Sequence, residues 1–173
     1  MNKLDFIKKL KSNNIDYTHF EKYLNQGDAI LDYQAGFGRD SIHFSENYDV
    51  TAINISAELA AQLSAKILKS FCVDVREAKF MNHFHAIWVY ESFAELELDI
   101  LAETLDSMFL ALKKDGVIQI NLDQEKIEAF DFDQMAKRHK FIIEDKEKIT
   151  NPNLVSEFAY YRYILRRGSL MSK

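Results

Sequence analysis

The chain has 173 residues, of which 47% are hydrophobic and 28% are charged, a composition typical of one soluble globular domain. Its formal net charge of −5 argues against nucleic acid or an anionic membrane as a general partner, and no apolar run is long enough to span a membrane. The single cysteine, Cys72, excludes a disulfide framework and the first residues lack the apolar core of a secretory signal, so we expect a cytoplasmic protein.

Short apolar runs in the first half of the chain indicate three strands separated by helical patterns. The strands are expected at Ala29–Tyr33, Val50–Asn54 and Phe71–Val73. The helices are expected over residues 3–24, over residues 38–47, and from an N-cap at Ser56 through the repeat Leu59, Leu63 and Ile67. Strand and helix therefore alternate along this half.

The second half continues the alternation and then departs from it. An uninterrupted apolar strand is expected at Ala86–Tyr90, and apolar residues at helical spacing predict a helix over residues 101–112. A strand at Gly116–Leu122 follows, and then a helix that ends near His139. The last two strands have no helix between them and are expected at Phe141–Ile143 and Val155–Leu165.

Strands that alternate with helices and then end in a helix-free pair predict an α/β fold. We expect a three-layer, doubly wound, Rossmann-like sheet that is mostly parallel, with an antiparallel C-terminal edge strand. One domain is expected over residues 1–173, divided into a helical lid at 1–24, a ligand-binding core at 28–122 and a C-terminal helix and strand pair at 123–173.

The stretch from Ile30 to Ser41 carries the strongest functional signal. Asp32 lies in the first strand, and Gly36 and Gly38 follow in a turn that leads into a helix. Glycine permits positive φ and lets a ligand lie against bare backbone, so this turn is expected to hold a ligand. The alternative is an ordinary strand-to-helix turn in which Asp32 acts only as a cap.

Four further stretches follow this turn, namely Val50–Ser56, Val73–Glu77, Phe84–Trp88 and Leu112–Val117. Together with Ile30–Ser41, they resemble in order and spacing the motifs of the class I S-adenosylmethionine-dependent methyltransferases, and within them the small tellurite-resistance-like and type 11 relatives. Val50–Ser56, for example, is similar to a second strand usually written V-T-A-I-D-I-S. The resemblance covers roughly residues 23–122.

The resemblance implies S-adenosylmethionine as the cofactor, S-adenosylhomocysteine as the product and a small-molecule methyl acceptor. The residues it implies at the cofactor are Asp32, Gln34, Gly36, Gly38, Asn54, Ile55, Asp74, Val75 and Tyr90. Asn54 occupies the position of the carboxylate that accepts hydrogen bonds from both ribose hydroxyls, and Ile55 the position of the residue that packs on the adenine ring. Asp74, with Val75 beside it, stands for the acid that receives the adenine amino group. The backbone around Gly36 and Gly38 stands beside the methionine and ribose part of the cofactor, and Tyr90 stands near the methionine moiety.

Two positions depart from the pattern of the family. Gln34 stands where a glycine is usual, so a side chain is carried at positive φ and is expected to enter the slot for methionine. Asn54 replaces the carboxylate, and its single accepting oxygen cannot take two ribose O–H bonds, at a loss of about 1–2 kcal/mol. The predicted function is methyl transfer to a small molecule. The alternative is a catalytically inactive domain that binds a partner or metabolite.

Other chemically capable residues favour structural roles. His83 and His85 are spaced to share one face of a strand, but no third ligand accompanies them, so no metal site is expected. Glu91 and Glu95 follow the fourth strand and form either a base near the substrate or, as the better interpretation, a solvated loop.

Arg39 is expected on the surface of its helix, and Cys72 in the core. A nicotinamide-dependent oxidoreductase is disfavoured, because Asn54 is not the acid that such enzymes place on the ribose. The sequence leaves a monomer and a homodimer equally open.

Overall fold

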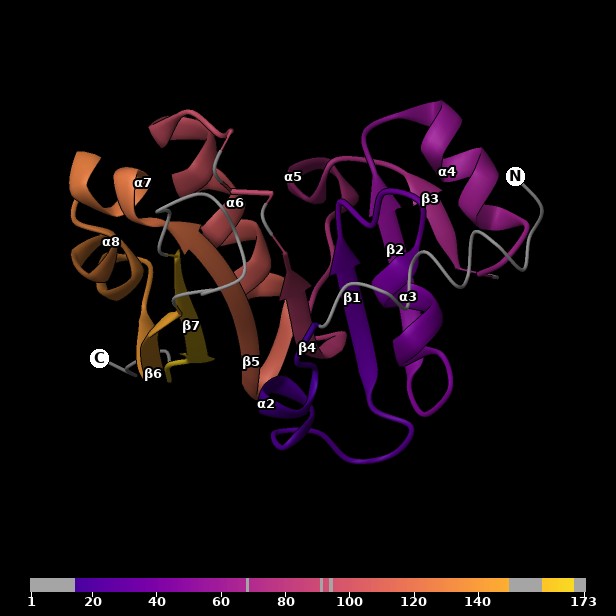
Figure 1. The fold of residues 1–173 in the computed structure, drawn as a ribbon, viewed down its shortest axis with the longest axis horizontal. Coiled ribbons are helices and arrows are strands. Elements are labelled where there is room, and N and C mark those ends of the chain that lie inside the picture. Colours follow the sequence, from indigo (N-terminus) through magenta and orange to yellow (C-terminus); the bar gives the residue numbers. More distant parts are fainter. Residues whose placement is uncertain (1–14, 68, 91, 94, 150–159, 170–173) are drawn as a thin grey trace.

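The computed structural model describes residues 15–67, 69–90, 92–93, 95–149 and 160–169. Within them, one seven-stranded sheet has the order β3-β2-β1-β4-β5-β7-β6 (Figure 1). Its strands are β1 (Ala29–Tyr33), β2 (Asp49–Asn54), β3 (Ser70–Cys72), β4 (Phe84–Val89), β5 (Leu112–Asp123), β6 (Phe141–Ile149) and β7 (Tyr160–Arg167). The helices are α2 (Thr18–Glu21), α3 (Arg39–Phe44), α4 (Ala57–Ser64), α5 (Val75–Ala78), α6 (Leu98–Ala111), α7 (Gln124–Ala129) and α8 (Phe132–Arg138).

The direction of winding reverses between β1 and β4. Strands β1 to β5 pair in parallel, and β2 and β3 lie on one side of β1 while β4 and β5 lie on the other. In doubly wound sheets, ligands bind beyond the carboxyl ends of the strands at such a reversal. The predicted doubly wound, mostly parallel fold is confirmed. One detail differs, because the antiparallel strand β7 lies between β5 and β6, and β6 forms the edge.

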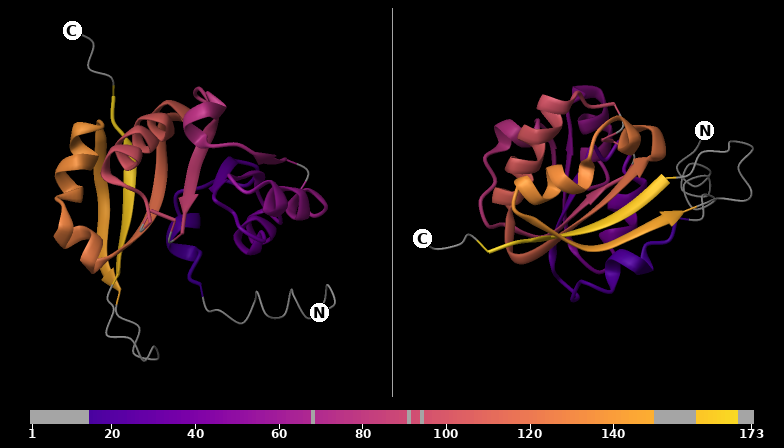
Figure 2. Two further views of the ribbon diagram at one scale, coloured as in Figure 1. Left: turned by 90° about the horizontal axis from the view of Figure 1, so that it is seen from above. Right: turned by 90° about the vertical axis from the view of Figure 1, so that its left-hand side faces the viewer.

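Helices cover both faces of the sheet and complete three layers (Figure 2). Side chains alternate along β1, so Leu31 and Tyr33 join the core under α5, α6 and α8. Ile30 points to the other face and packs with Phe20 of α2 and Phe44 of α3. In the described part of the chain, no helix is long and apolar enough to cross a membrane.

Several predicted boundaries change where tertiary pairing or capping decides them. The N-terminal helix predicted over residues 3–24 is seen as α2 alone, and residues 1–14 lie outside the described chain. The helix predicted to end near His139 is two helices, because the backbone at Phe130 is extended and Asp131 caps α8 by accepting the Gln134 N–H at 3.0 Å. The strand predicted at Phe141–Ile143 continues to Ile149, because β7 pairs along its whole length.

The predicted burial of Cys72 is wrong. Strand β3 has three residues and forms the edge of the sheet, so this thiol is exposed. The same apolar run can form an edge strand or a central strand, and only the order of the strands in the sheet distinguishes the two positions. Residues 155–159 of the last predicted strand lie outside the described residues.

Candidate functional site

The turn after β1 is held by backbone hydrogen bonds and by residues at positive φ. The Ala35 N–H donates to Ile53 O at 3.0 Å, and the Gly38 N–H donates to Ala35 O at 2.9 Å. Gln34, Gly36 and Gly38 have φ values of 53°, 57° and 88°. Two of the amide groups that the turn was expected to offer to a ligand are therefore already used inside the turn and the sheet.

The two glycines of the turn have different roles. A Cβ at Gly38 would lie 2.1 Å from Cδ1 of Leu63, so Gly38 is needed for the turn to pack against α4. A Cβ at Gly36 would meet no atom within 4 Å. Gly36 is therefore the glycine beside open space, as the predicted ligand turn requires.

Asn54, the last residue of β2, is turned into this glycine turn. Its Oδ1 accepts the Gly36 N–H at 2.9 Å, and its Nδ2 donates to Gly36 O at 3.3 Å. The side chain of Asn54 clamps both polar backbone groups of Gly36 and is only 1% exposed. For Asn54 to reach a ribose, as the sequence predicts, these bonds must first open.

Asp32 and Ser41 form a buried pair behind the turn. The Ser41 hydroxyl donates to Asp32 Oδ2 at 2.5 Å. Burial, with a smaller contribution from the neighbouring Asp40 carboxylate, raises the pKa of Asp32 to about 8. Asp32 thus ties β1 to α3.

The carboxylate of Asp40 binds two side chains that are distant in sequence and also its neighbour Arg39. It accepts the Tyr17 hydroxyl at 2.6 Å, the Trp88 Nε1–H at 2.9 Å and the Arg39 Nε–H at 2.7 Å. The Arg39 guanidinium lies 4.8 Å from the centre of the Tyr90 ring. Arg39 is thus partly exposed, and Asp40 and Tyr90 hold its guanidinium against this cluster.

Asp74 is the N-cap of α5 and is paired with Arg76. Its Oδ1 accepts the Arg76 N–H at 2.8 Å, and its Oδ2 accepts the Arg76 Nη2–H at 2.8 Å. The hydrogen bond from the Arg76 side chain holds the pKa of Asp74 below its usual value. Arg76 also reaches Glu103 of α6 at 3.1 Å, so one arginine links α5 to α6.

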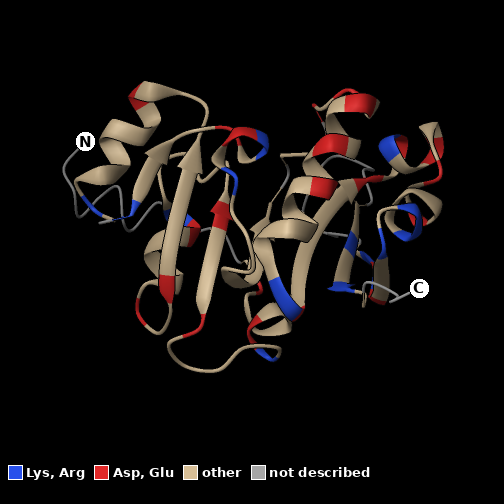
Figure 3. Cartoon of the chain, turned by 180° about the vertical axis from the view of Figure 1, so that it is seen from behind, with Lys and Arg blue, Asp and Glu red and all other residues tan. Residues whose placement is uncertain are grey.

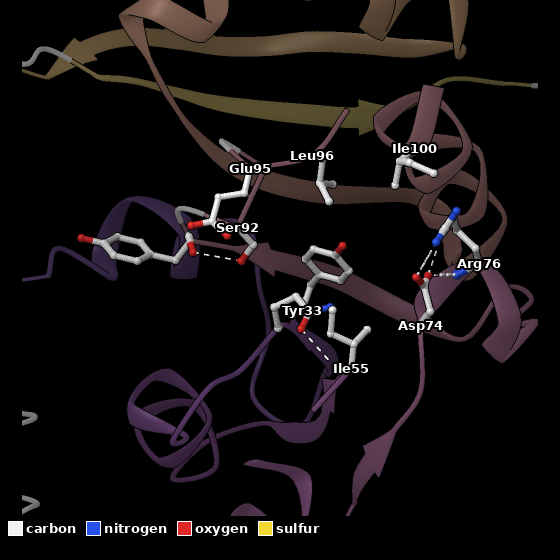
Figure 4. A pocket seen from close by; sticks show the side chains of 10 residues that line it. Tyr33, Ile55, Asp74, Arg76, Ser92, Glu95, Leu96 and Ile100 are labelled. Carbon is white, nitrogen blue, oxygen red and sulfur yellow. Dashed lines mark hydrogen bonds and ion pairs between the residues drawn. The ribbon is translucent and has the colours of Figure 1, made fainter. Parts of the chain in front are cut away.

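A cavity of about 450 Å³ opens where β1, β2 and β4 end (Figure 4). It is lined by Tyr33, Gln34, Ile55, Asp74, Arg76, Tyr90, Ser92, Glu95, Leu96 and Ile100. Figure 4 shows the Asp74–Arg76 pair at one end, Ser92 and Glu95 at the other, and the ring of Tyr33 between them. The side chain of Gln34 bridges from β1 toward β2, because its Oε1 accepts the Ile55 N–H at 3.3 Å.

The structure brings four of the residues predicted at the cofactor to this cavity, namely Gln34, Ile55, Asp74 and Tyr90. The others do not line the cavity and are Asp32, Gly36, Gly38, Asn54 and Val75. Glu95, predicted as a base or a solvated residue, lines the cavity. The sequence analysis missed Arg76, whose spacing of two from a capping acid was a usable signal. It also missed Leu96 and Ile100, which carry no motif.

Among the described residues, no three His, Cys, Asp or Glu side chains gather in a way that could hold a metal ion. His85 has a structural role, since its Nδ1 accepts the Ala29 N–H at 2.9 Å and so joins β4 to the start of β1. His83 precedes β4 and packs on the ring of Phe84 at 4.7 Å between ring centres.

No protein-family model and no curated protein matches the sequence. Solved structures do match the fold. The 1,6-didemethyltoxoflavin-N1-methyltransferase of Burkholderia thailandensis, solved with 1,6-didemethyltoxoflavin and S-adenosylhomocysteine, has a TM-score of 0.74 at 16% identity over 95% of this chain and 86% of that one. A TehB-like S-adenosylmethionine-dependent methyltransferase of Corynebacterium glutamicum has a TM-score of 0.72 at 19% identity, over 92% and 94% of the two chains.

The 4+2 cyclase SpnF also matches, with a TM-score of 0.70 at 14% identity over 88% of this chain and 80% of that one. The chain therefore has the fold of the class I S-adenosylmethionine-dependent methyltransferases, as the sequence motifs predicted. The cyclase shows that this fold is found with more than one kind of chemistry, so the reaction has to be argued from the residues of the site.

Proposed function

We propose that this protein binds S-adenosylmethionine in the cavity at the ends of β1, β2 and β4 and transfers its methyl group to a small-molecule acceptor. The position of the cavity carries the proposal. It lies at the reversal of winding and next to the glycine turn, where doubly wound sheets bind ligands. Its volume of about 450 Å³ is within the range of about 300–1,000 Å³ typical of cofactor and small-molecule sites.

The two ends of the cavity suit the two ends of this cofactor. Ile55 is 64% exposed and offers an apolar surface on which an adenine ring can lie. Asp74 beside it is kept ionised by Arg76, so it can accept a hydrogen bond from an exocyclic amino group. Tyr90 also lines the cavity, and the guanidinium of Arg39 lies over its ring. Gly36 leaves open space at the turn.

S-adenosylmethionine bound here would supply an electrophilic methyl group on a sulfonium sulfur. Transfer needs an acceptor held in line and kept from water, and little else from the protein. Leu96 and Ile100 supply the apolar wall that excludes water. Glu95 is the carboxylate on the same wall that we propose as the acceptor of the proton released by the substrate.

A small acceptor fits this surface better than a nucleic acid. The net charge is −5, and Lys and Arg positions are interspersed with Asp and Glu along the elements (Figure 3). The exposed free thiol of Cys72 favours a reducing compartment, so we extend the proposal to a cytoplasmic location.

A binding module without chemistry is the second candidate. Two observations favour it. Asn54 is hydrogen-bonded to Gly36, and the carboxylate oxygens of Asp74 are hydrogen-bonded to Arg76. Both residues are predicted cofactor ligands. A protein that binds S-adenosylhomocysteine but turns over no acceptor would support this second candidate over methyl transfer.

Titration calorimetry with S-adenosylhomocysteine tests the proposal directly. We expect micromolar binding by the native chain and weaker binding after Asp74→Ala, with Glu58→Ala in α4 as a control for loss of an exposed helical carboxylate outside the cavity. Release of S-adenosylhomocysteine from labelled cofactor, with pools of small-molecule acceptors, then tests transfer. Absence of binding by the native chain would refute the proposal.

A further inference from the structure

We propose that Gln34, and not Asn54, is the residue that meets the ribose hydroxyls of the bound cofactor, and that Asn54 is a structural clamp of the glycine turn. This inference rests on the proposed function, because it needs a nucleoside in the cavity. It reassigns one recognition role between two side chains that lie on either side of the same turn.

The hydrogen bonds and the burial of Asn54 keep it from a ligand in the cavity. Both of its amide groups are bonded to Gly36, one as acceptor at 2.9 Å and one as donor at 3.3 Å. The residue is 1% exposed and does not line the cavity. A ribose contact by Asn54 would break two bonds that define the path of the turn.

Gln34 is also hydrogen-bonded, to the Ile55 N–H and to the Tyr33 side chain, but unlike Asn54 it lies in the wall of the cavity. Its side chain lines the cavity beside Tyr33 and Ile55, the residues that stand between the Asp74–Arg76 pair and Glu95. Its Oε1 accepts a bond from the Ile55 N–H at 3.3 Å, a long bond that a ligand can replace at little cost. The carboxamide has an acceptor and a donor side by side, so one hydroxyl of a vicinal diol can donate to its oxygen while the other accepts from its nitrogen.

The backbone of Gln34 points to the same role. Its φ of 53° lies in the left-handed region, where a side chain is carried at a cost and glycine is preferred. Side chains held in such strained positions gather at ligand sites, where the contact they make offsets the strain. A glycine here would relax the backbone and remove the carboxamide.

Gln34→Gly therefore distinguishes a side chain that binds the ribose from one that blocks the cofactor, because the affinity for S-adenosylhomocysteine falls in the first case and rises in the second. If Gln34 recognises ribose, the variant melts at a higher temperature yet binds S-adenosylhomocysteine about tenfold more weakly, since two neutral hydrogen bonds are lost. If the side chain only fills the cofactor slot, affinity rises instead. Gln62→Ala is the matched control, because Gln62 is an exposed glutamine of α4 bonded to Glu58 and remote from the cavity.

The 2′,3′-dideoxy analogue of S-adenosylhomocysteine ties the loss to the diol. We expect the native chain to bind the analogue about tenfold more weakly than S-adenosylhomocysteine, and Gln34→Gly to bind the two alike. If Gln34→Gly binds S-adenosylhomocysteine as tightly as the native chain or more tightly, the inference is overturned. Binding by the native chain in the same experiment still supports the proposed function. If neither protein binds any nucleoside probe, the proposed function fails and this inference fails with it.

Discussion

Asn54→Asp restores the acid that the family pattern has at the end of β2, yet the structure predicts that it destabilises this protein. The Nδ2–H bond to Gly36 O is replaced by a carboxylate oxygen that faces a carbonyl oxygen about 3.3 Å away. The site is 1% exposed, so water cannot solvate the new charge. Losing one bond costs about 1 kcal/mol and the unsatisfied groups a further 1–3 kcal/mol, partly offset by a stronger bond from the Gly36 N–H. We expect a net loss of about 2 kcal/mol at pH 8.

Thermal unfolding as a function of pH tests this reasoning. A loss of about 2 kcal/mol lowers the melting temperature by roughly 4–8 °C in a chain of this length. Burial raises the pKa of the introduced carboxyl above its unfolded value, so the deficit is smallest below pH 4 and grows as pH rises through the folded pKa. A protonated carboxyl can again donate to Gly36 O. Asn47→Asp, at an exposed position after α3, is the control. A melting temperature at pH 8 equal to or above that of the native chain would refute the clamp assigned to Asn54.

Three further predictions address the turn and the core behind it. Gly38→Ala should lower the free energy of unfolding by at least about 2 kcal/mol, because φ is 88° and the new Cβ would lie 2.1 Å from Leu63 Cδ1. Chemical denaturation measures this loss. A loss of the same size in a Leu63→Ala background would contradict the steric cause. Asp32→Asn should have a higher melting temperature than the native chain at pH 9 and the same melting temperature at pH 4. The raised pKa of Asp32 makes the native chain lose stability as the pH rises between these values. The same difference in melting temperature at both pH values would contradict this. Trp88→Phe should cost about 2 kcal/mol in denaturant titrations, because its Nε1–H no longer reaches Asp40, and an unchanged midpoint would argue against that bond.

The alternation of strands and helices could be predicted because it depends on patterns that local sequence carries. Continuous apolar runs such as Ala86–Tyr90 indicate strands buried on both faces, and the helix-free ending indicates the antiparallel strand. The break at Phe130 and the full length of β6 could not be predicted, because one depends on a cap at Asp131 and the other on pairing with β7. Exposure of Cys72 likewise depends on its place at the edge of the sheet.

The site could be located from the sequence but its hydrogen bonds could not. The motifs placed Gln34, Ile55, Asp74 and Tyr90 at one edge, and the structure brings them to one cavity. Whether an amide at the end of β2 faces the cavity or a neighbouring peptide is decided by which partner offers both a donor and an acceptor. For Asn54 that partner is Gly36, eighteen residues earlier. Spacing along the chain carries no information about that choice.

The chain contains one tryptophan, and its position makes it a built-in optical probe of this site. The indole of Trp88 is buried, donates to Asp40 and stacks on the ring of Tyr90 with 5.9 Å between ring centres. Tyr90 lines the cavity, and Asp40 also accepts a hydrogen bond from Tyr17, the residue before α2. Fluorescence emission from this single indole therefore reports, without any added label, both ligand binding in the cavity and the packing of Tyr17.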